Sequence, residues 1–202
     1  MNKAVGPWRQ RSIETVYENP WIKVEHHEVT TPAGSDGIYG KVCFKSRAVG
    51  VVPLDANGNT YLVKQFRYPL EEVSWEIPEG GCPLGESTLL TARRELEEET
   101  GFRASRVYKL LELHLSNSVC DEGADVFLAL DLMPGEACLE DSEADLEVLQ
   151  LPLHDAIAMA LDGRITDAIS VAALLKIRVL LNEENGDIDA LVARMTALEH
   201  LA

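Results

Sequence analysis

Residues 80–102 read GGCPLGESTLLTARRELEEETGF, and this stretch decides the fold of the chain. Its second half consists of strong helix formers, and Gly101 supplies the usual stop. Glu95, Glu98 and Glu99 stand three and four residues apart, so the expected helix carries three carboxylates on one face. Like charges so placed repel one another. A hard divalent cation would remove the repulsion, because it prefers carboxylate oxygen as a ligand.

Two interpretations of these carboxylates stand open on their own evidence. Most glutamate runs form a solvated acidic helix face, and the alternative is a metal site. Arg94 precedes Glu98 by four residues and can orient a carboxylate ligand without binding the metal itself. Gly80 and Gly81 permit close backbone approach just before the helix. The carbonyl of the adjacent Glu79 would be a further ligand.

The full spacing favours the metal site. The segment matches G-x5-E-x7-R-E-U-x-E-E-x-G-U, the Nudix box, and chance would produce such a match on the order of 10⁻⁵ times in a chain of this length. The sequence therefore resembles the Nudix hydrolases. The resemblance implies their fold, an α/β/α sandwich around a mixed sheet. The matched positions are Gly80, Glu86, Arg94, Glu95, Leu96, Glu98, Glu99, Gly101 and Phe102.

Flanking motifs resemble the ADP-ribose and nucleotide-sugar pyrophosphatase branch. In that branch a K-Q-x-R strand precedes W-E-x-P-x-G, and an S-x-x-x-x-D/E-E loop follows the box. Asn117 departs from the proline often found in that loop. The resemblance implies Mg²⁺-dependent hydrolysis, with Mn²⁺ as a substitute, of the pyrophosphate bond of ADP-ribose or a related nucleoside diphosphate sugar. The products would be a nucleoside monophosphate and a sugar phosphate. The motifs here are KQFRYP at 64–69, WEIPEG at 75–80 and SNSVCDE at 116–122.

Metal-binding residues follow from the resemblance position by position. It assigns Glu95, Glu99 and the carbonyl of Glu79 to the cation. Glu98 would assist as part of the catalytic group together with Arg94. Glu86 would be a peripheral carboxylate near the metals.

Substrate-binding residues are also implied by the resemblance. Arg67 would contact the pyrophosphate, Glu76 the sugar or base, and Glu122 the substrate from the loop after the box. Trp21 and Tyr39 match positions where aromatic rings stack on the base, although ordinary packing explains them equally well. Arg67 has the alternative of an exposed strand residue, but an arginine in so apolar a run needs an anionic partner.

The general base in this branch comes from an acidic loop before the last strand. Here that loop lies within residues 134–145. Glu143 falls nearest the expected position and Glu140 is second. A loop without a catalytic member stays open as an alternative.

Composition limits the partners. The chain has 202 residues with 18 Lys and Arg against 34 Asp and Glu, a net charge of −16. No basic stripe of the kind that binds nucleic acid is visible, so local arginines or cations must bind an anionic substrate.

The four cysteines lack C-x-x-C spacing and predict free thiols in a reducing compartment. No secretory signal and no stretch able to span a membrane is evident, so we expect a cytoplasmic protein.

The chain organisation predicts an α/β protein with an N-terminal antiparallel β appendage at 1–45 and a Nudix domain at 46–202. Two appendage strands, 16–31 and 38–44, would form a hairpin that is marginal alone. We therefore expect a homodimer, with residues 1–45 serving dimerisation and substrate binding; a hairpin folded onto its own subunit is the alternative. Thr166 is expected to cap a helix. Elsewhere we expect strands at 48–54, 61–66, 105–115, 124–132 and 146–151, and helices at 86–100, 154–161, 167–181 and 188–201.

Rival functions also remain. The enzymatic alternative is a Nudix hydrolase of dinucleoside polyphosphates, nucleoside triphosphates or coenzyme A, against which the Arg67 and Trp75 motifs argue. A non-catalytic nucleotide sensor is disfavoured by the intact box, because a sensor need not keep every carboxylate.

Overall fold

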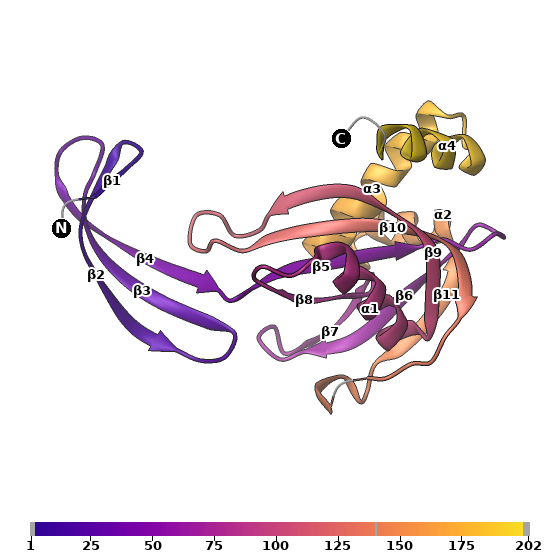
Figure 1. The fold of residues 1–202 in the computed structure, drawn as a ribbon, viewed down its shortest axis with the longest axis horizontal. Helices are drawn as coiled ribbons and strands as arrows, with labels where there is room; N and C mark the ends of the chain where they lie inside the picture. The colour runs from indigo at the N-terminus through magenta and orange to yellow at the C-terminus, as the bar shows by residue number, and fades with distance from the viewer. Residues whose placement is uncertain (1–2, 140, 200–202) are drawn as a thin grey trace. The chain divides into compact units, whose positions relative to one another are not determined.

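The computed structural model describes residues 3–139 and 141–199. The chain forms two compact units. One contains the residues up to Arg47 together with Pro83–Gly85 and His114–Gly123, and the other contains the remainder. Figure 1 labels the strands and helices of both units.

The first unit is built on a four-stranded antiparallel sheet of order β1-β2-β3-β4. The expected two-strand hairpin is therefore wrong in strand number. The run over residues 16–31 is divided by a turn in which Asn19 Oδ1 accepts from the N–H groups of Trp21 and Ile22. The strands are β1 (Lys3–Val5), β2 (Trp8–Glu18), β3 (Ile22–Thr30) and β4 (Asp36–Phe44).

The second unit holds two sheets, of order β8-β5-β10-β9 and β11-β6-β7. Strands β5 and β10 run parallel and β6 pairs antiparallel with both neighbours, so the strand directions are mixed. The strands are β5 (Ser46–Pro53), β6 (Asn59–Arg67), β7 (Glu72–Glu76), β8 (Glu79–Pro83), β9 (Phe102–His114), β10 (Gly123–Pro134) and β11 (Glu147–Pro152). The helices are α1 (Thr88–Thr100), α2 (Leu153–Asp162), α3 (Ala168–Glu183), α4 (Ile188–Glu199) and the short 3₁₀ helix η1 (Asp141–Glu143).

Helices cover both faces of the β8-β5-β10-β9 sheet, and β5 shows why. Successive strand residues point to opposite faces. Val49 and Val51 pack in one buried cluster with Leu96 of α1. Gly50 faces the other way, where an added Cβ would lie 2.9 Å from Ile169 Cγ2 in α3. Figure 1 shows α1 in front of the strands and α3 behind them. The predicted α/β/α sandwich is confirmed.

The ends of α1 and α3 are fixed by local capping. Ser87 caps α1 by accepting from the N–H of Leu90, and Gly101 ends it in the left-handed conformation (φ 71°). Asp167, not Thr166, caps α3, because its carboxylate accepts from the N–H of Ser170 at 2.7 Å. The expected Thr166 cap is wrong by one residue.

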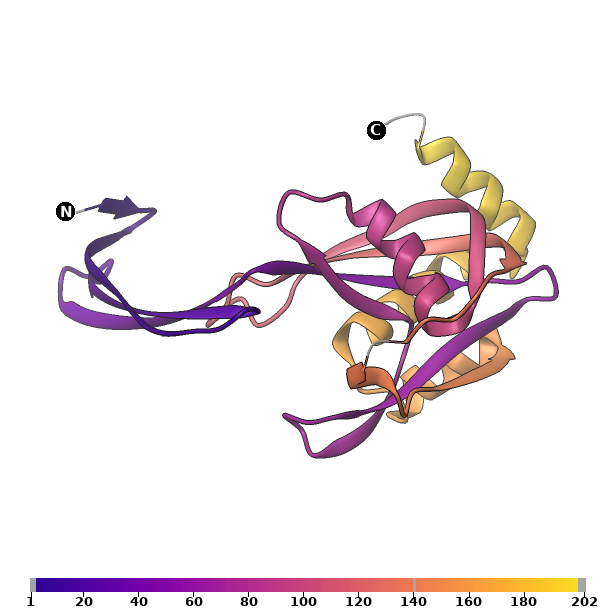
Figure 2. The same cartoon turned by 60° about the horizontal axis from the view of Figure 1, so that its bottom comes forward.

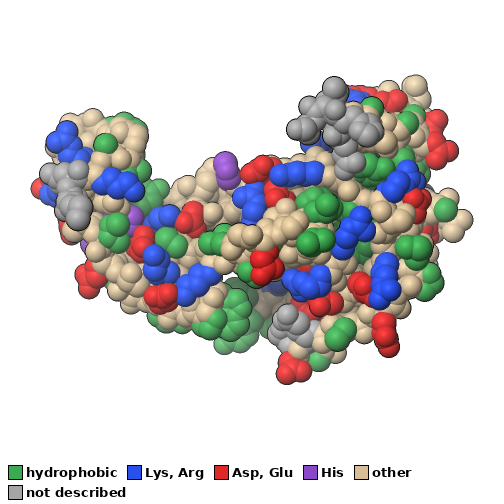
Figure 3. All heavy atoms as spheres, in the orientation of Figure 1, with side chains coloured by type: hydrophobic (Ala, Val, Ile, Leu, Met, Phe, Trp, Pro, Cys, Tyr) green, Lys and Arg blue, Asp and Glu red, His purple; other side chains and the backbone are tan. Residues whose placement is uncertain are grey.

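Surface and sulfur chemistry agree with the composition. On the face drawn in Figure 3, basic and acidic side chains are interspersed. All four cysteines are free, as predicted. In the described ranges no helix combines the length and the apolar character needed to cross a membrane.

Candidate active site

The backbone before α1 touches the helix at Gly80. A Cβ at this position would lie 2.2 Å from the carboxyl carbon of Glu95, so any side chain would displace that carboxylate. One residue earlier, the N–H of Glu79 donates to Glu99 Oε2 at 3.0 Å. The close approach expected at Gly80 is confirmed, and it brings main-chain atoms against two of the box carboxylates.

Glu95 and Glu99 are buried rather than solvated, with exposed fractions of 6% and 1%. Burial raises the pKa of Glu95 to about 7, and Glu98 and Glu143 reinforce this while Arg94 opposes it. Burial raises the pKa of Glu99 to about 9, followed by repulsion from Glu143 and Glu95. Among the described residues, the buried Oε1 of Glu99 has no hydrogen-bond partner. Crowded carboxylates with an unpaired oxygen fit a divalent cation.

Arg94 connects the carboxylates of α1. Its guanidinium donates to Glu98 Oε2 at 2.5 Å and to Glu95 Oε1 at 2.6 Å. A third, longer hydrogen bond reaches the carbonyl of Gly81 at 3.3 Å. Arg94 therefore lies beside the expected carboxylate, Glu98, and also fixes Glu95.

The acidic loop after β10 runs alongside the C-terminal end of α1 (Figure 2). The N–H of Gly135 donates to the carbonyl of Gly101 at 2.7 Å, and the N–H of Cys138 to that of Glu98 at 3.0 Å. Beyond this attachment, η1 carries Glu143, whose charge raises the pKa values of both buried α1 carboxylates. Glu143 is thus electrostatically coupled to them. Glu140 lies outside the described residues.

Arg67 has its anionic partners within the protein. Its guanidinium binds both carboxylate oxygens of Glu76 and donates to Glu79 Oε1 at 2.7 Å. Burial alone would lower the pKa of Arg67, but the two carboxylates outweigh it and raise it. Arg67 is therefore not simply an exposed strand residue. Any phosphate that it contacts must share it with these two glutamates.

Asp167 is a site residue that the sequence did not reveal. Ligand atoms of Glu76, Glu79 and Asp167 all lie within 4.8 Å of one another. Burial, Asp167 and Glu76, in that order, raise the pKa of Glu79 well above its ordinary value. In this segment the sequence pointed only to Thr166, as a helix cap, and not to the carboxylate beside it.

The remaining candidates divide between the units. Trp21 is 71% exposed, so its ring is free to contact a ligand. Tyr39 stacks edge-on against Trp8 with ring centroids 5.8 Å apart, an arrangement that favours packing. Glu122 is half-buried in the first unit. Glu86 is exposed ahead of α1 in the second.

Comparison with known proteins follows the same division. A profile described as "NUDIX domain" matches residues 44–172, and one described as "Nucleoside diphosphate sugar hydrolase N-terminal domain" matches residues 8–42. The chain is 38% identical to the ADP-ribose pyrophosphatase of Bacillus subtilis (strain 168) over 128 residues, 63% of this chain and 69% of that one. It is 33% identical to the GDP-mannose pyrophosphatase of Yersinia pestis (strain Pestoides F) over 125 residues, 58% and 63% of the two chains. The crystal structure of an ADP compounds hydrolase superposes with a TM-score of 0.80 at 25% identity, covering 92% of this chain and 100% of that one.

Proposed function

Because this chain belongs to the Nudix family, we propose that it hydrolyses the pyrophosphate bond of ADP-ribose or a related nucleoside diphosphate sugar with Mg²⁺ as cofactor. The products would be a nucleoside monophosphate and a sugar phosphate. The observation that carries the proposal is the buried Glu95–Glu99 pair: of the two, Arg94 reaches only Glu95, and the buried Oε1 of Glu99 has no hydrogen-bond partner among the described residues, so a bound cation would stabilise the pair. The names of the relatives support the substrate class.

The cation would be held by the carboxylates of Glu95 and Glu99 and the carbonyl of Glu79, with Glu98 and Glu86 at the periphery. When bound, Mg²⁺ would neutralise the diphosphate and acidify a water molecule. Such a set of oxygen donors suits Mg²⁺, and Mn²⁺ would substitute for it.

The protein's own groups would divide the remaining work. Glu143 would accept the proton of the attacking water, since its charge already acts on both buried glutamates. Arg94 would keep Glu95 and Glu98 in place. Arg67 would donate hydrogen bonds to the pyrophosphate and would give up some of its hydrogen bonds to Glu76 and Glu79.

Sugar and base recognition would fall to other side chains. Glu76 would contact the sugar or base. Glu122 would accept hydrogen bonds from the substrate, and Trp21 and Tyr39 would contribute aromatic surface to the base.

We further propose a homodimer in which residues 1–45 serve assembly and substrate binding, and residues 46–202 form the hydrolase domain. The first unit leaves large apolar side chains about half or more exposed, and packing against a second copy would remove this apolar area from water. These side chains are Val5, Ile13, Val16, Tyr17, Trp21 and Ile38.

A substrate panel tests the proposed function. Phosphate release, after added phosphatase, would be compared for ADP-ribose, GDP-mannose, UDP-glucose, NADH, diadenosine polyphosphates and deoxynucleoside triphosphates, each with Mg²⁺, Mn²⁺ or excess chelator. We expect turnover of one or more nucleoside diphosphate sugars, abolished by chelator. Preference for polyphosphates would favour the enzymatic alternative. Nucleotide binding without any turnover would identify a sensor.

A further inference from the structure

The loop of residues 116–122 ends in a carboxylate that lacks a partner. In the described part of the chain, no hydrogen bond or ion pair reaches the carboxylate of Glu122, and burial raises its pKa. A half-buried carboxylate in this state gains from a ligand that donates hydrogen bonds, such as a hydroxyl group. How well Glu122 can bind a substrate depends on how rigidly the loop of residues 116–122 is held.

Strand β4 holds this loop by its backbone. The N–H of Val42 donates to the carbonyl of Val119 at 2.9 Å, and the N–H of Asp121 donates back to the carbonyl of Val42 at 3.2 Å. The hydroxyl of Tyr39 donates to the carbonyl of Ser118 at 2.5 Å. The loop is thus paired with β4 like a short additional strand.

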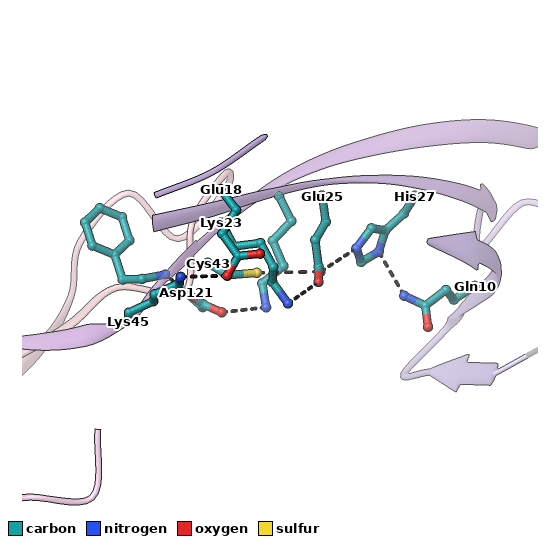
Figure 4. A network of polar contacts seen from close by, with 10 residues as sticks. Gln10, Glu18, Lys23, Glu25, His27, Cys43, Lys45 and Asp121 are labelled. Carbon is teal, nitrogen blue, oxygen red and sulfur yellow. Dashed lines mark hydrogen bonds and ion pairs between the residues drawn. The ribbon is translucent and has the colours of Figure 1, made fainter. Parts of the chain in front are cut away.

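Asp121 adds the side-chain attachment, and it uses both carboxylate oxygens (Figure 4). Oδ1 accepts from the N–H of Phe44 at 2.9 Å, and Oδ2 pairs with Lys41 Nζ at 2.6 Å. Burial would raise the pKa of Asp121, but these contacts outweigh it and lower it. The carboxylate is therefore ionised and bound at neutral pH, immediately before Glu122.

The sheet that receives Asp121 is cross-linked by side chains (Figure 4). Gln10 Nε2 lies 2.9 Å from His27 Nδ1, and His27 Nε2 lies 3.0 Å from Glu25 Oε2. The Sγ of Cys43 donates to the same Glu25 oxygen at 3.6 Å. This chain of contacts joins β2, β3 and β4, so β4 is a supported anchor for the loop.

We propose that Asp121 is a positioning residue: bound to Lys41 and to the N–H of Phe44, it holds the loop on β4 so that Glu122 meets the substrate in one orientation. The inference rests on the proposed function, in which Glu122 contacts the substrate. It gives the N-terminal sheet a part in substrate affinity that is separate from dimer assembly.

Variants at the attachment test this inference by the separation of KM from kcat. Asp121→Ala should raise KM for the preferred nucleoside diphosphate sugar about 10-fold, with kcat changed less than about 2-fold. Asp121→Asn keeps an acceptor for the N–H of Phe44 and should have a smaller effect, as should Lys41→Met. Lys45→Met is the matched control, because it removes the same charge from an ion pair in which Lys45 Nζ lies 2.6 Å from Glu18 Oε1, and this pair includes neither Asp121 nor Glu122 (Figure 4). It should behave like the wild type.

A double-mutant cycle separates positioning from general damage. In a Glu122→Gln background, Asp121→Ala should produce little further rise in KM; an equal rise in both backgrounds, or no rise in either, would overturn the proposal. Hydrogen exchange gives a second readout that does not depend on turnover. The amides of Val42 and Asp121 should exchange faster in Asp121→Ala and Lys41→Met than in Lys45→Met, and unchanged protection would also overturn it. Wild type without turnover of any nucleoside diphosphate sugar would instead reject the proposed function.

Discussion

Glu99→Gln changes one buried carboxyl of α1 into a neutral group of the same shape, and it should act in opposite directions on stability and on activity. The carboxyl is 1% exposed, and its pKa is raised from the ordinary 4.5 to about 9. Between those pH values the unfolded chain loses a proton that the folded, metal-free protein keeps. The contribution of this one carboxyl to the free energy of unfolding, without metal, is therefore complete below about pH 4.5. It falls as the pH rises and levels off near pH 9.

The magnitude follows from the distance between pH 7 and 4.5, which is 2.5 units. At about 1.36 kcal/mol per unit, ionising this carboxyl in the unfolded chain costs the folded state about 3 kcal/mol at pH 7. Glutamine removes that cost and still offers an oxygen to the N–H of Glu79. In chelator at pH 7 the variant should therefore melt roughly 6–12 °C higher than the wild type.

With Mg²⁺ the difference in melting temperature between the variant and the wild type should shrink or change sign, because a cation bound only by the folded wild type adds stability. Turnover by Glu99→Gln should fall on the order of 10³-fold, since the cation's contribution of several kcal/mol to the transition state is largely lost. Glu97→Gln is the control: it removes the same charge from the same helix, but this glutamate pairs with Arg103 and its pKa is lowered. That variant should keep its activity and gain no stability.

Thermal melts at pH 5, 7 and 9 in chelator and in Mg²⁺, together with coupled phosphate release, measure both effects. The reasoning is refuted if Glu99→Gln melts at the wild-type temperature in chelator at pH 7 and the two proteins respond equally to Mg²⁺. Full activity of the variant, or of the wild type in excess chelator, would refute the metal mechanism itself.

Three further outcomes are expected. Glu143→Gln should lower kcat about 10²- to 10⁴-fold with little change in KM; if Glu140→Gln alone shows that loss in steady-state assays, the base has been placed on the wrong residue. Gly80→Ala should weaken Mg²⁺ binding, so that a titration of activity needs more Mg²⁺ to reach half its maximum, because the new methyl group displaces the Glu95 carboxylate; Gly40→Ala, where an added Cβ meets nothing within 4 Å, should not change the titration. Light scattering should give twice the chain mass at micromolar concentration. A monomer with normal KM would reject the dimer, and a dimer indifferent to Trp21→Ala would reject only the stacking role.

Sequence patterns predicted those elements whose signals are local. Helix α1 is limited by residues within or next to it, Ser87 and Gly101, and the all-apolar stretch of β5 is typical of a strand buried on both faces. The sequence did not predict strand β2 in full, because WRQRSIETVYE shows no regular alternation of apolar and polar residues and lies mostly exposed. The short strands β7 and β8 contain glutamate, glycine and proline, which rank low for strand formation.

The candidate site divides in the same way. The carboxylates of α1 and their neighbour Arg94 were predictable, because helix periodicity alone places them together. The grouping of Glu76 and Glu79 with Asp167 was not, because about 90 residues separate the partners and only the folded chain brings them within 4.8 Å. That Arg67 binds Glu76 and Glu79 was open for the same reason, since the sequence required an anion but did not say which one.

The alternation along β5 has a consequence for insertions and deletions. Val49 and Val51 fill the side toward α1, whereas Gly50 leaves room for Ile169 on the other side. Adding or removing one residue upstream in this strand would exchange its two faces. A valine side chain would then clash with α3, and glycine would leave a cavity beneath α1, the helix that carries the box. Length variation among natural homologues should therefore be absent from β5 and gather in the turns, such as the one at Asn57 and Gly58.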